Sequence, residues 1–239
     1  MELDFGELEG IDVGDVNQKT KKGVVDIIFV IDISASMGPA IKNLTMNLAN
    51  FINKLDPNKI QNYRVKAFSF GDLEMDSAET KLNVSRPWTS NPQELVSQLT
   101  ECVKLVQNGG GGDEPESSLD AVYIASRDGF EEHWSERKRV IVLFTDATPK
   151  KIIKETLLGV DADGLQLLSQ QINDNHTHLF MFSPEHEDYQ FIASNSARYV
   201  NYRPIDKAGK TPVEALIEID YSEVLERLGE EVSEVSVLS

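Results

Sequence analysis

Residues 24–38 read VVDIIFVIDISASMG, and this stretch decides the fold. Its first part, 24–33, is an almost continuous apolar and β-branched run, the pattern of a strand buried on both faces of a parallel sheet. After Pro39 the apolar residues follow a helical period instead. They are Ile41, Leu44, Leu48, Phe51, Ile52 and Leu55. A buried strand followed by an amphipathic helix is the repeating unit of an α/β domain.

The same alternation of strand and helix continues along the chain. Further strands are expected over residues 63–70, 139–145, 177–182 and 198–202, and a short edge strand over 81–88. Helices are expected after Asn91, from Pro115, over 165–173 and near 186–195. The sequence therefore predicts a doubly wound α/β fold with a mainly parallel six-stranded sheet, one antiparallel edge strand and helices on both faces.

Three segments are expected from the changes in composition. Residues 1–22 form an acidic N-terminal arm, 23–205 the α/β domain, and 206–239 a C-terminal acidic helical extension. Apolar residues between Thr211 and Leu228 keep a helical period, so this extension is expected to pack on the domain or on a partner.

Composition excludes several classes of function. The chain has 239 residues and a formal net charge of −17, which disfavours binding to nucleic acid and to anionic membranes. Cys102 is its one cysteine, so neither a disulfide framework nor a multi-cysteine zinc site is expected. The sequence shows no signal-peptide pattern and no apolar run long enough to cross a membrane, and the expected location is cytoplasmic.

Oxygen-bearing side chains follow the predicted strands where those strands end. Asp32, Ser34 and Ser36 alternate directly after the first strand, and Asp146 ends the stretch LFTD of a later one. Asp113 follows a glycine turn that leads toward a helix. The carboxyl ends of parallel strands meet at one edge of a sheet, so these loops can converge. Hard oxygen ligands of this kind suit Mg²⁺, and also Mn²⁺ or Ca²⁺.

The sequence DISASMG resembles the D-x-S-x-S motif of the metal-ion-dependent adhesion site (MIDAS) of von Willebrand factor type A (VWA) domains. The buried strand before it, the GGGGDEPE loop at 109–116 and LFTD at 143–146 stand in the order of that family. The resemblance covers about residues 24–202. It implies a Rossmann-like fold and a divalent cation held at the rim of the sheet.

The resemblance also implies a role for each residue. Ser34 and Ser36 would bind the metal directly, and Asp32 and Asp146 would hold metal-bound waters or act from behind the ligands. The family usually has a threonine in the glycine loop, and Asp113 stands in its place here. Some intracellular relatives, including alpha-kinase-linked type A domains, show a similar G-G-G-D-x-P-E loop.

Each of these residues also has a simpler interpretation. Ser34 and Ser36 can cap the helix that begins near Gly38, and Asp113 can cap a helix beginning at Pro115. Glu114 would then complement a helix dipole. Similarly, Asp72, which follows the second strand, is more typical of a turn than of a ligand.

Other motifs indicate structure rather than chemistry. Glycines 109–112 follow a helix and lack a Gly-Lys-Ser/Thr ending, so nucleotide binding is not expected. His176 and His178 are expected to be packed or solvated, and 161–164 to hold a helix cap rather than calcium. The lysines within 150–154 are expected to form a solvated face.

Three functions of different classes remain. The first is a module that binds another protein, through a partner Asp or Glu that completes the metal's coordination. Intracellular relatives act in assemblies with an AAA+ ATPase, kinase or phosphatase. The second is a scaffold with a closed structural metal. The third, a metal-dependent hydrolase, lacks a histidine in the motif loops. We therefore expect a non-enzymatic binding module.

Overall fold

The computed structural model describes residues 22–74, 82–83, 86–107, 115–130, 137–153, 156–160 and 162–236. Its strands are β1 (Gly23–Asp32), β2 (Ile60–Phe70), β3 (Leu82–Asn83), β4 (Arg137–Phe144), β5 (Thr177–Ser183) and β6 (Val200–Pro204). Its helices are the 3₁₀ turn η1 (Ala35–Met37), α1 (Gly38–Lys54), α3 (Pro92–Gln107), α4 (Ser118–Asp128), α5 (Gly164–Asp174), α6 (Glu187–Asn195), α7 (Pro212–Ile217) and α8 (Tyr221–Ser236). Among these helices, none is long and apolar enough to span a membrane.

The strands form one six-stranded sheet in the order β3-β2-β1-β4-β5-β6. Every pairing is parallel except that of β3, which runs antiparallel to β2 at the edge. The predicted fold class is therefore confirmed. Within the described residues the edge strand is shorter than the predicted 81–88, since β3 comprises Leu82 and Asn83.

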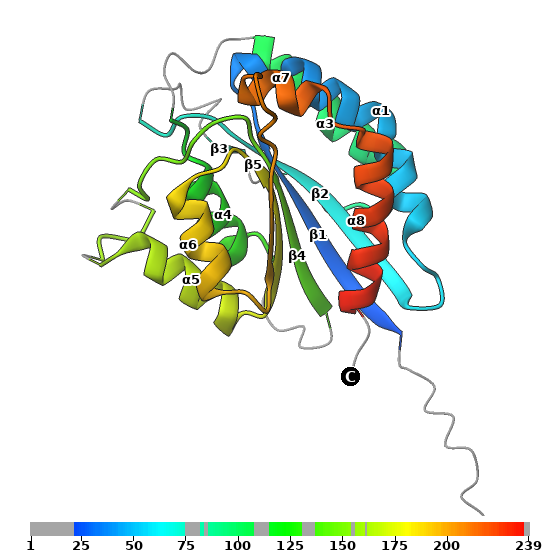
Figure 1. The fold of residues 1–239 in the computed structure, drawn as a ribbon. Coiled ribbons are helices and arrows are strands. Elements are labelled where there is room, and N and C mark those ends of the chain that lie inside the picture. The colour runs from blue at the N-terminus through cyan, green and yellow to red at the C-terminus, as the bar shows by residue number, and fades with distance from the viewer. Residues whose placement is uncertain are drawn as a thin grey trace, which may run out of the picture.

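Helices cover both faces of this sheet (Figure 1). Helices α1, α3, α7 and α8 lie on one face, and α4, α5 and α6 lie on the other. Side chains of a strand alternate between the two faces, so β1 contributes to both cores. Ile27 and Phe29 belong to the first core, and Ile28 and Val30 belong to the second. This double burial explains why β1 is apolar almost throughout.

One buried acid interrupts the apolar run of β1. Asp26 is 3% exposed, and its carboxylate accepts hydrogen bonds from Arg64 Nε at 2.9 Å and Arg64 Nη2 at 2.7 Å. It also pairs with Arg137 of β4. A buried carboxylate needs such partners, and these two arginines lie on the neighbouring strands β2 and β4. The cluster therefore links the three central strands near their N-terminal ends.

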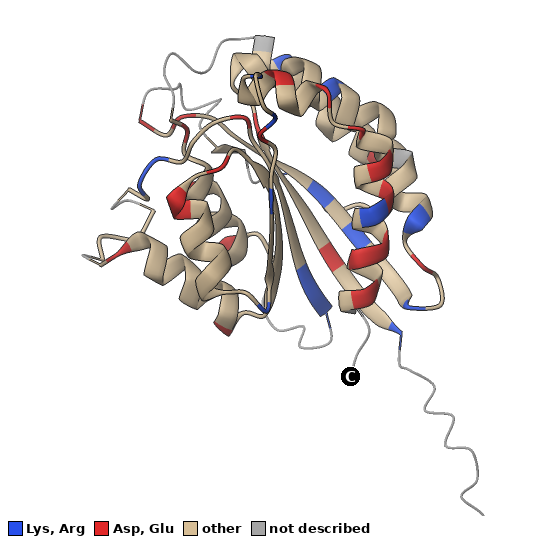
Figure 2. Cartoon of the chain, viewed as in Figure 1, with Lys and Arg blue, Asp and Glu red and all other residues tan. Residues whose placement is uncertain are grey.

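The C-terminal helices pack on the domain, as expected. Helix α8 lies along α1, and its Leu225 and Leu228 are fully buried in the first core. Acidic residues recur along this helix and are coloured red in Figure 2. Helix α7 begins with a capping box in which the Thr211 and Glu214 side chains satisfy each other's backbone N–H groups. The segment boundaries at 22 and 205 remain predictions.

The helix expected to begin at Pro115 begins at Ser118 instead, so that prediction is wrong by three residues. The backbone of Glu116 is engaged elsewhere: its N–H donates to Thr148 O at 3.0 Å, and its carbonyl accepts from Lys150 N at 2.8 Å. These bonds hold residue 116 in an extended bridge and exclude it from the helix.

Candidate metal centre

The predicted metal residues that the structure describes come together at one edge of the sheet. Asp32 is the last residue of β1, and Asp146 follows the end of β4 by two residues. Because β1 and β4 are parallel neighbours, their carboxyl ends meet at the same edge. Ser34 and Ser36 lie in the turn between β1 and α1. Asp113, the fifth predicted residue, lies outside the described residues.

Asp32 is held in a defined orientation. Its side chain is 0% exposed. Oδ1 accepts a hydrogen bond from Ser34 N at 2.8 Å, and Oδ2 accepts one from Thr145 Oγ1 at 2.6 Å. Both carboxylate oxygens therefore have a protein partner, one from the turn after β1 and one from the end of β4.

The two serine hydroxyls face each other. Ser34 Oγ and Ser36 Oγ are 3.1 Å apart. Neither caps a helix: the Ser34 side chain makes no capping bond at η1, and the residue before α1 is Met37. The simpler interpretation of these serines as caps is therefore wrong. Ser36 is exposed, whereas Ser34 is buried, so one residue of the pair lies in the interior and the other lies at the surface.

The electrostatics of the carboxylates fit a nearby cation. Burial, together with the negative charge of Asp146, raises the pKa of Asp32 to about 7. The hydrogen bonds from Thr145 and Ser34 oppose that rise. Two buried carboxylates that destabilise each other's charge are the arrangement that a divalent cation relieves.

The donor set also fits such an ion. Two carboxylates and two hydroxyls offer only hard oxygen ligands, which suit Mg²⁺, Mn²⁺ or Ca²⁺. The described ranges contain no group of three or more His, Cys, Asp or Glu residues placed to hold a metal.

A layer of hydrogen bonds behind the centre was missed by the sequence analysis. Thr145 Oγ1 donates to Asp32 and accepts from Ala147 N at 3.1 Å. The hydroxyl of Tyr189, a fully buried residue of α6, donates to Ala147 O at 3.3 Å and lies 2.7 Å from Ser118 Oγ. Thr145 could have been suspected from its place beside Asp146, but an aromatic residue in an amphipathic helix carries no such signal.

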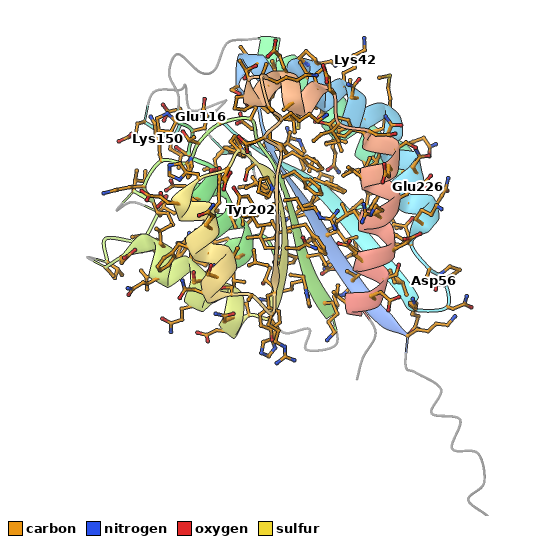
Figure 3. The ribbon with its side chains drawn as sticks, viewed as in Figure 1. Lys42, Asp56, Glu116, Lys150, Tyr202 and Glu226 are labelled. Atoms are coloured by element: carbon orange, nitrogen blue, oxygen red, sulfur yellow. The ribbon has the colours of Figure 1, made fainter. Side chains whose placement is uncertain are left out.

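Asp72 and Lys150 form a second polar pair at this edge. Asp72 Oδ1 accepts from Glu74 N at 2.9 Å, the turn contact that was predicted, and Oδ2 pairs with Lys150 Nζ at 2.7 Å. Lys150 lies next to Glu116 on the same rim (Figure 3). The side chain of Lys150 is only 13% exposed, so the predicted solvated face is wrong at that position. The ammonium group of Lys150 is largely removed from water, and the carboxylate of Asp72 compensates its charge.

The other motifs have structural roles, as predicted. His176 and His178 pack on Tyr199, with ring centroids 5.5 and 5.4 Å away. The carboxylate of Asp163 caps α5, accepting from Leu165 N at 2.9 Å. Cys102 is a buried free thiol whose pKa is raised by burial.

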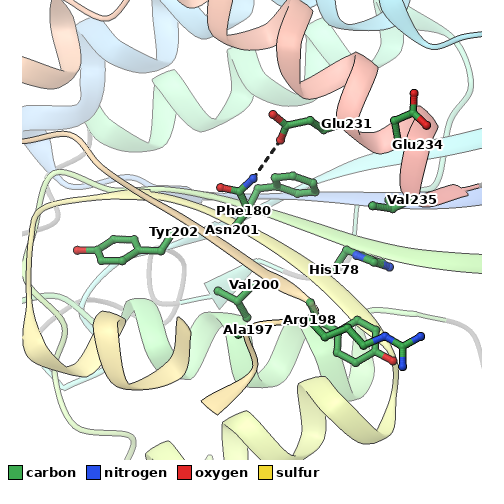
Figure 4. Close-up of a pocket in the computed structure, with 11 residues that line it drawn as sticks. His178, Phe180, Ala197, Arg198, Val200, Asn201, Tyr202, Glu231, Glu234 and Val235 are labelled. Atoms are coloured by element: carbon green, nitrogen blue, oxygen red, sulfur yellow. Dashed lines mark hydrogen bonds between the residues drawn. The ribbon is translucent and has the colours of Figure 1, made fainter. Parts of the chain in front are cut away.

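A groove of about 510 Å³ lies away from this centre, between α8 and β6 (Figure 4). Phe180, Val235 and His178 are among its lining residues, and Glu231 accepts a hydrogen bond across it from Asn201 Nδ2 at 3.1 Å. Burial and the charges of Lys138 and Arg198 lower the pKa of His178 to about 4. His178 lies near the N-terminal end of β5, whereas the candidate centre lies beyond the carboxyl ends of the strands, so the groove is separate from it.

Solved structures share this fold. Proximal thread matrix protein 1 from the mussel byssus is 11% identical, with a TM-score of 0.50, 89% of this chain covered and 47% of that chain. The open pilus adhesin SpaC from Lactobacillus rhamnosus GG is 14% identical, with a TM-score of 0.52, 90% of this chain covered and 30% of that chain. This chain thus spans about half of one relative and under a third of the other.

One further comparison concerns metal. A form of the mussel protein described as having a zinc-occupied MIDAS motif is 10% identical, with 88% of this chain and 48% of that chain covered and a TM-score of 0.48. Comparison with curated protein sequences gives no match. The family model of the von Willebrand factor type A domain matches residues 26–204, most of the chain. With its β1–β4 edge and D-x-S-x-S turn in place, the chain belongs to the von Willebrand factor type A domain family.

Proposed function

We propose that this VWA domain binds another protein through a divalent cation at the rim of its sheet. The proposed ligand set comprises Asp32, Ser34, Ser36, Asp113 and Asp146. Mg²⁺ is the proposed ion, with Mn²⁺ and Ca²⁺ as substitutes of similar oxygen preference. The cation would supply an open coordination position for a carboxylate of the partner.

The pair of serine hydroxyls is the observation that carries this proposal. Ser34 Oγ and Ser36 Oγ lie 3.1 Å apart and cap no helix, so helix formation does not explain why two serines stand there. Ser34 is hydrogen-bonded to Asp32, whose carboxylate lies near enough to Asp146 to feel its charge, and these two acids are 0% and 5% exposed. Buried carboxylates next to paired hydroxyls form a site whose oxygens suit a cation and whose negative charge disfavours an anion.

Exposure favours an open centre over a closed structural one. Ala35 and Ser36, on the outer side of the turn, are both exposed. A groove of about 810 Å³ at the same rim is lined by Pro115, Pro149 and Ile152 and also by charged side chains, those of Glu74, Lys150, Lys151, Glu187 and Asp188. Residues that flank a partner's carboxylate can lie in this groove, which makes a protein a better ligand than a small ion.

A hydrolytic function is less favoured by the geometry. His186 lines the rim groove at the start of α6, but its Nδ1 accepts a hydrogen bond from Asp188 N at 3.2 Å. The His186 ring therefore caps a helix, and a nitrogen occupied in this way is not available as a general base.

We propose a cytoplasmic partner in an assembly with an AAA+ ATPase, kinase or phosphatase, as in intracellular relatives of the family.

The double variant Ser34→Ala with Ser36→Ala tests the metal site. We expect it to abolish Mg²⁺ and Mn²⁺ binding, since it removes both hydroxyl ligands. The fold should survive, because the change removes two hydroxyl groups and no apolar core side chain. Isothermal titration calorimetry measures the binding, and circular dichroism measures the fold.

Ser90→Ala is the matched control, because Ser90 is an exposed serine on the loop before α3. It should bind metal as the wild type does. Unchanged binding by the double variant would refute the site. Capture of a partner from lysate with and without EDTA then separates the two binding models: a closed structural metal predicts capture that EDTA does not reduce.

A further inference from the structure

The hydroxyl of Tyr189 joins the start of α4 to the segment that follows β4, behind the candidate centre. Tyr189 lies in α6, far along the chain from both, and its side chain is fully buried. Its hydroxyl lies 2.7 Å from Ser118 Oγ, at the start of α4, and donates to Ala147 O at 3.3 Å. Ser118 follows the glycine loop that carries Asp113, and Ala147 follows Asp146 directly.

The contact to Ala147 continues to the centre itself. Ala147 N donates to Thr145 Oγ1 at 3.1 Å, and that hydroxyl donates to Asp32 Oδ2 at 2.6 Å. Asp32 Oδ1 in turn accepts from Ser34 N at 2.8 Å. A continuous series of hydrogen bonds therefore runs from Tyr189 on α6 to the serine turn after β1.

The Tyr189 ring is held firmly enough to fix its hydroxyl. Its centroid lies 5.9 Å from that of Tyr202 and 6.3 Å from that of His186. Burial raises the pKa of Tyr189 above the ordinary tyrosine value, so the hydroxyl keeps its proton and remains a donor. A buried, protonated hydroxyl can set the distance between the start of α4 and the segment after β4, both of which it contacts.

We propose that Tyr189 is a positioning residue for the metal centre: its hydroxyl sets the spacing between the Asp146 loop and the start of α4. This inference rests on the proposed metal-binding function. Groups that orient metal ligands typically change metal affinity by about 10–100-fold when removed. Tyr189 contacts Ser118 and Ala147 and none of the described ligands, so we expect an effect of about tenfold, the lower end of that range.

The variant Tyr189→Phe tests the inference, since it removes the hydroxyl and keeps the ring. We expect the Mn²⁺ dissociation constant, measured by calorimetry on the full chain, to rise about tenfold. Tyr202→Phe is the matched control. Its hydroxyl also makes two hydrogen bonds, donating to Pro184 O at 2.6 Å and accepting from His186 N at 3.2 Å. Those partners precede α6, so Mn²⁺ affinity should stay at the wild-type value.

A melting curve in EDTA separates positioning from general stability. Both tyrosine variants lose hydrogen bonds, buried ones at Tyr189 and part-buried ones at Tyr202, so both should melt at a lower temperature without metal. A purely structural role for Tyr189 predicts that its Mn²⁺ affinity, measured where the variant is fully folded, equals that of the wild type. The positioning role predicts that the affinity falls in Tyr189→Phe alone.

Ser118→Ala provides a second, independent comparison. Because Ser118 and Tyr189 share one contact, the double variant should weaken Mn²⁺ binding by less than the product of the two single effects. Wild-type affinity in Tyr189→Phe, or an equal loss in Tyr202→Phe, would overturn the inference and leave the proposed function standing. Absence of Mn²⁺ binding by the wild type would overturn both.

Discussion

With Asp113 as a ligand, the charge at the proposed centre would differ from the usual pattern of the family. Two carboxylates, those of Asp32 and Asp146, would balance a dication, and neutral hydroxyls would complete its ligands. Asp113, in place of the usual threonine, would add a third carboxylate and leave one negative charge in excess. Opposite charges in contact attract more strongly than a cation and a hydroxyl do. The ion should therefore be held tightly and attract a partner's acid less.

Asp113→Thr is expected to weaken metal binding by roughly 10–100-fold, because a charged ligand becomes neutral. The same change should strengthen binding of acetate or an acidic peptide to the metal-loaded protein, since a like charge is removed. Calorimetry with Mn²⁺ and then with acetate measures both. If the variant holds Mn²⁺ as well as the wild type does, Asp113 is not a ligand and this charge argument is wrong.

The contact between α1 and α8 depends on a residue without a side chain. A Cβ atom added at Gly229 of α8 would lie 2.8 Å from Lys54 Cβ and 2.8 Å from the carbonyl oxygen of Phe51. Neither atom can move away easily, because one is a backbone atom of α1 and the other is attached directly to its backbone. The helices can approach this closely only because residue 229 is glycine.

Gly229→Ala should lower the free energy of unfolding by about 1–3 kcal/mol, the usual cost of overpacking. Gly38→Ala is the control, because a Cβ atom at Gly38 meets only Val106 Cγ1, at 3.5 Å. That variant should change stability by less than about 1 kcal/mol, and alanine's better helix propensity favours the folded state. Urea denaturation in EDTA measures both values. A Gly229→Ala protein as stable as the wild type would mean that α8 is free to shift.

The molecule as a whole consists of two cores that share one sheet, and the first core is completed only by the C-terminal helices. Leu216 of α7 and Tyr221, Leu225, Leu228 and Val232 of α8 are all buried in it. Burying a large apolar side chain contributes about 1.5–3 kcal/mol. The four residues of α8 together therefore contribute roughly 6–12 kcal/mol, similar to the about 5–15 kcal/mol that stabilises a whole domain.

A chain that ends at residue 205, the predicted domain boundary, should accordingly fail to fold cooperatively. We expect weak thermal transitions and exposed apolar surface, measured by calorimetry and by binding of a hydrophobic dye. A chain that begins at residue 22 is the control and should melt as the full chain does. Cooperative melting of the 1–205 fragment near the wild-type temperature would show that α7 and α8 are an accessory to the fold.

Much of this molecule could be predicted from local patterns. The apolar run of β1 and the helical period after Pro39 are properties of neighbouring residues, and they specify the alternation of strands and helices. Asp32, Ser34 and Ser36 could be placed at the rim because they directly follow a strand. The start of α4 could not be placed correctly, since the bridge from Glu116 to Pro149 competes with the helix.

What local patterns could not provide are the contacts between distant parts of the chain. Gly229 against Phe51, Lys150 on Asp72 and Tyr189 between Ser118 and Ala147 all depend on how crossovers stack helices on the sheet. Amino-acid type and spacing determine whether a segment is a strand or a helix, because that choice is made by neighbouring backbone and side-chain atoms. Whether two side chains from separate segments come into contact depends on the order of the strands and the packing of the helices. Both are established only when the complete core is packed.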